Sequence, residues 1–315
     1  MPASTHLRTG PPDKARTGKV SGMTLLKCAT HVVGDLAAAI ARYTEWMGYG
    51  LVEQGTVDAG LAALWQAPAS EGKGYAILQP ASGVDTFLRF VEGDPVADYA
   101  PIRTYGWAAI ELCVTDVEAV NEKMLASPFE VIGPPKNLDG FATVKPMQVR
   151  GADKETVYLT EMLVDGPSHG LPSPKSLVDR PFIMVLACPD LRKTAAWARD
   201  VLGLEVIEPV AIHYSMISKA FDLPADRKIE LVTAKWQGET FLEFDQYPDE
   251  ASERTVHPGQ LPPGVAITTM AHPDFARLSG HWAVEPAARE GALYAGRRVG
   301  MLRTPEGALL EVIEG

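Results

Sequence analysis

The chain has 315 residues, 46% of them hydrophobic and 22% charged, which is typical of a folded globular protein with about two domains. Its formal net charge of −11 argues against nucleic acid and membranes as partners, because both attract basic surfaces. No run approaches the ~18 consecutive apolar residues that a membrane helix needs.

The first 22 residues are polar and lack the apolar core of a secretory signal. We therefore expect a cytoplasmic protein in which residues 1–22 form a mobile tail. The cysteines are too few and too scattered for a disulfide framework or a zinc site. Each lies in or beside an apolar run and is expected to be a small buried side chain: Cys28, Cys113 and Cys188.

Apolar runs and capping residues predict four consecutive groups of elements. In the first group, Asp35 is expected to cap a helix that ends at Gly48. The helix of this group is 35–47, and its strands are 24–33, 49–54, 61–66 or 74–79, and 86–92. In the second group the helix is 116–126, and the strands are 106–114, 129–132, 142–149 and 156–164.

A segment rich in glycine, proline and serine, 165–180, follows and is interpreted as an inter-domain linker. The third group contains helices at 190–202 and 215–221 and strands at 182–188, 204–210, 228–236 and 240–245. The fourth group contains a short helix at 274–281 and strands at 265–271, 282–285, 297–303 and 308–313.

The four groups are copies of one βαβββ module, since in each an aspartate follows an apolar strand and begins a helix. These aspartates lie about 80 residues apart: Asp35, Asp116, Asp190 and Asp274. One module cannot bury its sheet alone, so the modules must pair. We expect an α+β protein whose four modules pair into two curved eight-stranded mixed sheets with outer helices.

The simplest pairing follows chain order. Modules one and two are then expected to form an N-terminal domain, 23–164, and modules three and four a C-terminal domain, 181–315, on either side of the linker. The concave side of each sheet is the natural place for a ligand cavity.

This pattern resembles the vicinal oxygen chelate superfamily, which includes glyoxalase I, bleomycin-resistance proteins and extradiol dioxygenases. The resemblance extends over 24–313. Three stretches carry it: an aspartate-leucine pair leading to WMG at 46–48, a second pair leading to VLGL at 201–204, and TPEGALLEV at 304–312. The resemblance implies the fold described above but no particular reaction, because proteins with this fold catalyse many different reactions.

The resemblance also implies where metal ligands would lie. One ligand is expected on the first strand of a module, seven residues before the capping aspartate, where this chain has Cys28, Ala109, Ile183 and Ile267. The other is a glutamate on the last strand, where we assign Arg89, Glu161, Glu243 and Glu311. Because the imidazoles are missing, we expect either no cofactor or a divalent metal at a non-standard site made of His213, Glu243 and Glu311.

Glu111 lies in an apolar strand, where an ionised carboxylate needs a partner. Arg89 and Glu161 are the expected partners. In one interpretation Arg89 orients a substrate oxygen while Glu111 or Glu161 acts as a base; in the other the group is a buried ion pair that joins two modules.

His213 lies in a loop that should overhang a cavity mouth, where it is a further candidate acid, base or ligand, although a solvated loop histidine remains the alternative. Four residues are candidates for contacting substrate, with core packing as the alternative for the strand aromatics among them: Tyr214, Tyr158, Gln148 and Trp107.

We therefore expect an enzyme of the lyase or isomerase type, which abstracts a proton next to a carbonyl of a small oxygenated substrate, with aromatic compounds among the candidates. A ferrous extradiol-type dioxygenase and a non-catalytic protein that sequesters a small ligand are the alternatives. The expected partners are a small molecule and a second copy of the chain in a homodimer.

Overall fold

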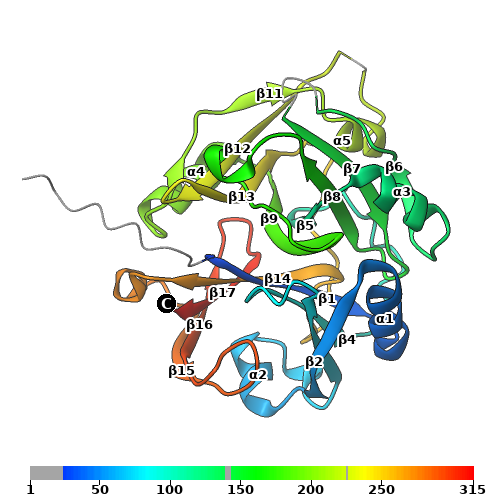
Figure 1. Ribbon diagram of the computed structural model, residues 1–315. Coiled ribbons are helices and arrows are strands. Elements are labelled where there is room, and N and C mark those ends of the chain that lie inside the picture. The colour runs from blue at the N-terminus through cyan, green and yellow to red at the C-terminus, as the bar shows by residue number, and fades with distance from the viewer. Residues whose placement is uncertain (1–23, 139–142, 225) are drawn as a thin grey trace, which may run out of the picture.

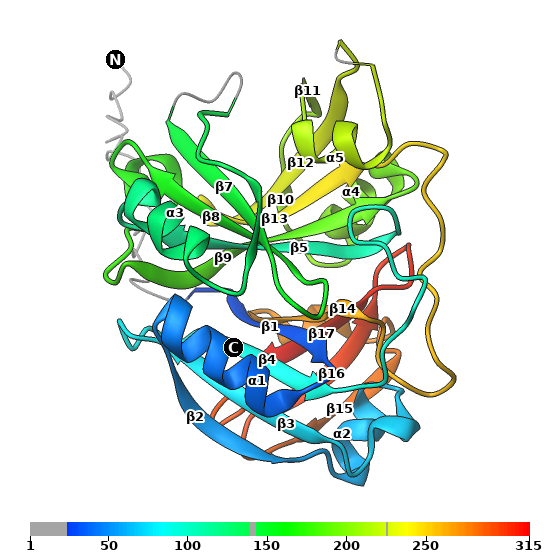
Figure 2. The ribbon, with the colours of Figure 1, turned by 90° about the vertical axis from the view of Figure 1, so that its right-hand side faces the viewer.

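The computed structural model describes residues 24–138, 143–224 and 226–315, and the predicted tail lies outside them. The described chain is α+β and contains four successive βαβββ-type modules (Figure 1). Their strands form two mixed sheets, one above the other in Figures 1 and 2. The predicted fold class is confirmed.

We call the lower sheet in Figure 1, which is built from modules one and four, the terminal sheet. Its eight strands run in the order β15-β16-β17-β14-β1-β4-β3-β2, with β1 and β14 antiparallel at its centre. The bounds are β1 (Leu26–Val33), β2 (Tyr49–Thr56), β3 (Gly74–Pro80), β4 (Phe87–Glu92), β14 (Gly264–His272), β15 (Val284–Ala288), β16 (Arg298–Arg303) and β17 (Leu309–Glu314).

We call the upper sheet, which is built from modules two and three, the central sheet. Its main path is β10-β12-β13-β9-β5-β8-β7-β6, and the short strand β11 also pairs with β12. The bounds are β5 (Gly106–Val114), β6 (Glu130–Gly133), β7 (Val144–Arg150), β8 (Thr156–Met162), β9 (Val178–Cys188), β10 (Glu205–Val206), β11 (Val210–Ile212), β12 (Ile229–Trp236) and β13 (Glu239–Gln246).

The expected pairing of the modules in chain order is therefore wrong. Module one pairs with module four, and module two with module three. The segment 165–180 is no inter-domain linker, because it joins β8 to β9 within the central sheet. The chain passes between the sheets at 93–105 and 247–263, which lie side by side (Figure 2) and are joined by a bridge from Thr104 to Ser252. Any pairing buries the same apolar faces, so the hydrophobic pattern does not select a partner.

The helices begin where the sequence predicts. Asp35, Asp116 and Asp190 each accept a hydrogen bond from a backbone N–H of the first turn, which satisfies a donor that the helix leaves unpaired. They cap α1 (Leu36–Arg42), α3 (Val117–Leu125) and α4 (Leu191–Asp200). In module four the predicted helix is only a 3-10 turn, Phe275–Leu278, and Asp274 makes no capping bond.

A glycine follows the first helix of modules one and three as predicted: Gly48 caps the π-helical turn Tyr43–Met47 that continues α1, and Gly203 follows α4. Gly48 and Gly203 have φ of 73° and 65°, a left-handed conformation that glycine adopts without a steric penalty. Of the alternative strands in module one, 74–79 is the correct one, because 61–66 lies mostly in α2 (Ala59–Leu64). The remaining α-helix is α5 (Ser215–Ala220), and the described ranges also contain short 3-10 helices at Pro68–Ser70 and Gly166–His169.

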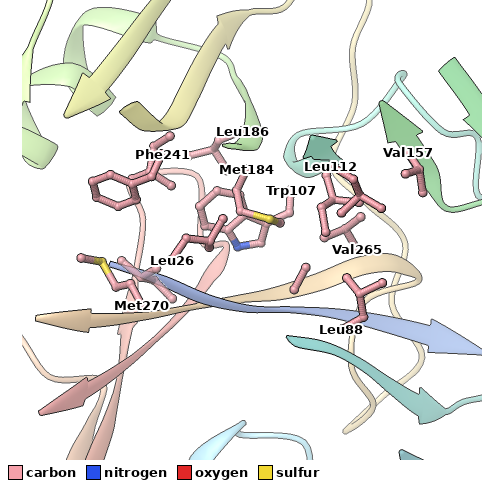
Figure 3. Packing of buried hydrophobic residues seen from close by; sticks show 14 of the residues in the cluster. Leu26, Leu88, Trp107, Leu112, Val157, Met184, Leu186, Phe241, Val265 and Met270 are labelled. Carbon is pink, nitrogen blue, oxygen red and sulfur yellow. The ribbon is translucent and has the colours of Figure 1, made fainter. Parts of the chain in front are cut away.

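The main hydrophobic core lies between the two sheets (Figure 3). Leu26 and Met270 from the terminal sheet face Met184 and Leu186 from the central sheet, and all four are buried. Two separate clusters fill the opposite, concave faces, one in each sheet. Across the described ranges, none of the helices has the length and apolar character to cross a membrane.

Candidate active site

Each concave face carries the same arrangement of four positions. In every module, the residue five before the capping aspartate lies opposite one residue of the last strand. In the terminal sheet the pairs are Thr30 with Arg89 and Thr269 with Glu311. In the central sheet they are Glu111 with Tyr158 and Val185 with Glu243. We call these sets the terminal and the central constellation.

This register corrects one assigned residue. The last-strand position of module two is Tyr158 and not Glu161. Glu161 lies three residues after Tyr158 on the same strand, so its side chain points to the other face of the sheet. There its carboxylate accepts a hydrogen bond of 3.1 Å from the Val117 N–H at the start of α3. Glu161 therefore contacts a helix and does not reach Glu111.

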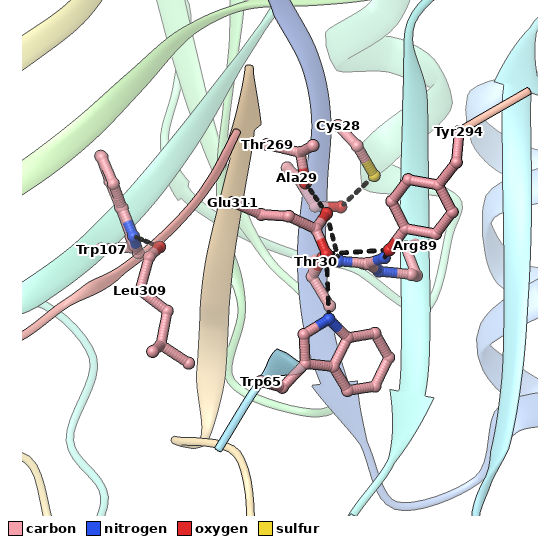
Figure 4. Close-up of polar contacts among 10 residues, drawn as sticks. All are labelled: Cys28, Ala29, Thr30, Trp65, Arg89, Trp107, Thr269, Tyr294, Leu309 and Glu311. Carbon is pink, nitrogen blue, oxygen red and sulfur yellow. Dashed lines mark hydrogen bonds and ion pairs between the residues drawn. The ribbon is translucent and has the colours of Figure 1, made fainter. Parts of the chain in front are cut away.

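In the terminal constellation the space between the four positions is filled by its own arginine (Figure 4), which together with Tyr294 also lines a neighbouring cavity of about 430 Å³. The Arg89 guanidinium lies 3.2 Å from the Glu311 carboxylate and donates to the Thr30 hydroxyl at 2.9 Å and the Tyr294 hydroxyl at 2.6 Å. The guanidinium also stacks on Trp65, 4.6 Å from the ring centroid. Both charged side chains are almost wholly buried. The neighbouring Glu311 carboxylate keeps the pKa of Arg89 above its ordinary value against the opposing effect of burial.

Glu311 is saturated with donors as well. Besides Arg89, it accepts hydrogen bonds from the Trp65 indole at 3.0 Å, the Thr269 hydroxyl at 2.7 Å and the Tyr294 hydroxyl at 2.8 Å. The expected pairing of Arg89 with Glu111 is wrong, because the two lie in different sheets. Arg89 does form a buried ion pair that joins two modules, as the second interpretation predicts, but its partner is Glu311, and the pair joins module one to module four.

The central constellation is open. A cavity of about 340 Å³ lies over it, with Glu111, Tyr158 and Glu243 among its lining residues. Other predicted residues line the same cavity: Gln148, His213 and Tyr214. Ile212, Met216 and Leu231 form apolar walls, whereas His213 is exposed. The structure thus brings together most of the predicted contacts in one place.

Trp107 is the exception among them. Its indole donates a 2.7 Å hydrogen bond to the Leu309 carbonyl, and its side chain is buried in the core between the sheets. It therefore joins the two sheets and does not line the central cavity.

Burial raises the pKa of the Glu111 carboxyl to about 8. The nearby Glu243 carboxylate adds to the increase, and a hydrogen bond from the Thr160 hydroxyl opposes it. A carboxyl of this kind exchanges protons near neutral pH, which an ordinary surface glutamate does not.

Two further carboxyl groups lie beside it. Burial raises the pKa of both Glu243 and Asp245, and the charge of the Glu243 carboxylate raises that of Asp245 further. Asp245 is 1% exposed, and in the described part of the chain its Oδ1 has no hydrogen-bond partner. The sequence signal that was missed is the spacing in the strand itself, because Glu243 and Asp245 are two residues apart and must share a face.

Two tyrosines supply hydroxyl groups at the same place. The Tyr214 hydroxyl lies 3.2 Å from both the Tyr158 hydroxyl and Glu243 Oε1. With one proton, it can donate to the carboxylate while it accepts from Tyr158. Burial raises the pKa of both tyrosines well above the ordinary value, so both keep their protons as hydrogen-bond donors.

The donor set does not fit the metal site that the resemblance implies. The central sheet has Ala109 and Ile183 at the two first-strand positions, and neither side chain can bind an ion. The alternative set is not assembled either, because Glu311 is paired with Arg89 in the terminal sheet, away from His213 and Glu243. Within the described ranges, no three His, Cys, Asp or Glu side chains are placed to hold a metal ion.

Comparison with known proteins identifies the fold. None of the protein-family models matches this sequence, and no curated protein is similar to it. Among solved structures, glyoxalase I from Zea mays is similar with a TM-score of 0.61 at 15% identity, with 92% of each chain covered. A candidate dioxygenase from Bacillus subtilis subsp. subtilis str. 168 is similar with a TM-score of 0.59 at 13% identity, covering 93% of this chain and 85% of that one. The chain therefore has the vicinal oxygen chelate fold.

Proposed function

We propose that this protein is an enzyme that moves a proton at the carbon next to a carbonyl of a small oxygenated substrate, within the central cavity. The observation that supports this most strongly is the Glu111 carboxyl, whose pKa of about 8 suits a group that must both take and return a proton near neutral pH. Isomerisation and elimination reactions both need such a group.

Glu111 and the two tyrosines have complementary roles in this proposal. The ionised Glu111 carboxylate takes the proton from carbon, the electron pair of the broken C–H bond forms the C=C bond of an enolate, and the π pair of the carbonyl group moves to its oxygen. When substrate binds, the hydroxyl groups of Tyr214 and Tyr158 turn from Glu243 and from each other and donate hydrogen bonds to that oxygen, where negative charge develops. On an α-hydroxy carbonyl substrate, an isomerase then returns the proton from Glu111 to the former carbonyl carbon, while the hydroxyl proton passes to the former carbonyl oxygen. In a lyase, Glu111 returns the proton to the leaving group as its bond to the enolate breaks.

The twin constellation supports the choice of cavity. In the terminal sheet the equivalent glutamate is saturated by donors from the protein itself. In the central sheet the equivalent Glu243 lines an open cavity together with a proton-exchanging carboxyl group. Catalytic groups need access to substrate, so the central site is the better candidate.

Hydrogen–deuterium exchange tests the chemistry without knowledge of the natural substrate. The purified protein is incubated in D₂O with a panel of small α-hydroxy ketones and aryl ketones, and loss of the C–H signal next to the carbonyl is followed by proton NMR. We expect exchange on at least one compound, abolished by Glu111→Gln and retained by Glu161→Gln. Saturable binding with no Glu111-dependent exchange would point instead to a protein that sequesters its ligand.

A further inference from the structure

The two constellations share a further feature besides their four strand positions, because each includes a tyrosine from outside these strands. Tyr294 and Tyr214 both lie between the strand after the helix and the next long strand, in modules four and three respectively. Each places its hydroxyl group on the glutamate of the last strand of its module: Tyr294 is 2.8 Å from Glu311, and Tyr214 is 3.2 Å from Glu243. The terminal constellation is therefore a template for what the central one can hold.

In the terminal sheet, the space between these groups contains the Arg89 guanidinium. Its three nitrogens contact Glu311, Thr30 and Tyr294 (Figure 4). In the central sheet the residue at the position of Arg89 is Tyr158, which carries no cation. The counterparts of the three contacted groups are all present there: Glu243, Glu111 and Tyr214.

The central sheet consequently has three carboxyl groups close together without an internal cation. For the part of the chain that the structure describes, no lysine or arginine forms an ion pair with Glu111, Glu243 or Asp245. Asp245 is buried with one oxygen lacking a hydrogen-bond partner there. Of these groups, Glu111 and Glu243 line the cavity, and each accepts a hydrogen bond from a neutral hydroxyl group, so a ligand that supplies positive N–H donors gains the interaction that Arg89 makes in the twin site.

We propose that the ligand of the central cavity carries a cationic nitrogen, as an ammonium or guanidinium group, which lies against Glu243 as the Arg89 guanidinium lies against Glu311. The nitrogen points toward the carboxyl groups, and a short apolar stem lies between Ile212, Met216 and Leu231. This inference rests on the proposed function only in taking the central cavity as the ligand site. For that function it specifies the substrate class as a carbonyl compound that also bears a basic nitrogen.

The opposite charge preference has weaker support. Lys136 and Lys219 line the same cavity, but both are exposed, where water screens their charge. An anionic group held there would still leave Glu111 and Glu243 without a cationic partner. A ligand cation placed beside Glu111 also favours its ionised form, which is the form that accepts a proton from carbon.

Isothermal titration calorimetry with three molecules of similar shape tests the charge preference. The probes are n-butylguanidinium, pentanamide and pentanoate. We expect the cation to bind about tenfold more tightly than the neutral amide, and the carboxylate to bind least. Glu243→Gln should remove this preference. Glu161→Gln, which alters a carboxylate on the other face of the same sheet, should retain it.

A second variant transplants the arginine of the twin site. Tyr158→Arg places a guanidinium at the position equivalent to Arg89, so it should pair with Glu243 and block the cation. We expect this variant to lose butylguanidinium binding and to unfold at a higher temperature than a Tyr158→Met control. If Glu243→Gln does not fold, the relative affinities of the three probes for the natural protein and the behaviour of Tyr158→Arg still decide whether the ligand is cationic.

The outcomes separate this inference from the proposed function. Pentanamide or pentanoate binding as tightly as butylguanidinium or more tightly would refute the proposed cationic ligand. Undiminished cation binding by Tyr158→Arg would refute it as well. Neither result would contradict the proposed proton transfer. Saturable, Glu243-dependent cation binding with no deuterium exchange on any compound, including amino ketones, would retain the cation and overturn the proposed chemistry.

Discussion

Glu111→Gln is expected to stabilise the protein while it abolishes proton transfer. The pKa of Glu111 is about 8 in the folded protein against an ordinary value of 4.5. The folded state therefore binds more protons than the unfolded state between these values, and the stability of the natural protein falls as pH rises from 4.5 to 8. Glutamine has the same shape, carries no charge and still accepts a hydrogen bond from Thr160, so it removes this pH-dependent loss.

The size of the gain follows from the shift in pKa. At 1.36 kcal/mol per pH unit, the shift corresponds to about 3 kcal/mol at pH 7 and to about 1 kcal/mol at pH 5. Glu111 lines an open cavity and is not fully buried, so solvent reduces the electrostatic penalty. We expect a measured gain of about 2 kcal/mol at pH 7.5, which falls toward zero near pH 5.

Urea unfolding at pH 5.0 and 7.5, on the natural protein and on Glu111→Gln, measures this difference. Deuterium exchange on the same samples should fall at least about 100-fold, the usual contribution of a general base. Glu161→Gln is the matched control and should not reproduce a pH-dependent gain. The reasoning is refuted if Glu111→Gln is less stable than the natural protein at pH 7.5, or if its gain is the same at both pH values.

Three other predictions follow from the same contacts. Arg89→Met leaves Glu311 buried without its cation, so we expect the free energy of unfolding in urea to fall by about 3 to 5 kcal/mol. If the variant still folds, it should retain deuterium exchange. A loss of exchange without a change in stability would contradict the structural role of Arg89. Tyr214→Phe removes a donor to the developing oxyanion and should lower the exchange rate about 100-fold with little change in thermal stability, whereas an unchanged rate would exclude that hydroxyl group. His31 is wholly buried, and burial lowers its pKa to about 3. The unfolded state therefore binds more protons than the folded state between pH 3 and 6.5, so the stability of the protein is lost as pH falls below 6.5. His31→Phe should recover about 2 kcal/mol at pH 5, measured as a shift in the urea midpoint that is absent at pH 8. A gain of equal size at both pH values would refute the assignment to His31.

The sequence predicts those features that depend on local interactions. The aspartates at 35, 116 and 190 begin helices because a short carboxylate side chain can satisfy the free N–H groups of the first turn. Gly48 and Gly203 end the first helices of modules one and three because glycine tolerates a left-handed conformation. Four repeats of this local pattern are sufficient to predict the fold class.

Pairing and register depend on contacts between distant segments, and here the prediction is wrong. All four first strands are almost continuously buried, so nothing in their composition selects β14 over β5 as the neighbour of β1. The same limit explains the choice of Glu161 over Tyr158. The repeat positions a glutamate on the last strand in modules three and four, and in module two a glutamate lies nearby but on the opposite face. Arg89 and Glu111 could be placed in different sheets only once the pairing was known.

The two constellations show how a repeated fold can assign opposite roles to equivalent positions. Arg89 neutralises Glu311 and, with Trp65 and Tyr294, closes the terminal constellation, which converts a potential site into an ion pair that joins modules one and four. In the central sheet, tyrosine at the position of Arg89 leaves Glu243 accessible, and Glu111 replaces the threonine of the twin site. The first difference removes the cation that neutralises the last-strand glutamate, and the second adds a carboxyl group whose hydrogen-bond donor is the neutral Thr160 hydroxyl group. Such an arrangement destabilises the folded protein, as the raised pKa of Glu111 indicates, and its retention is best explained if a ligand supplies the missing donor.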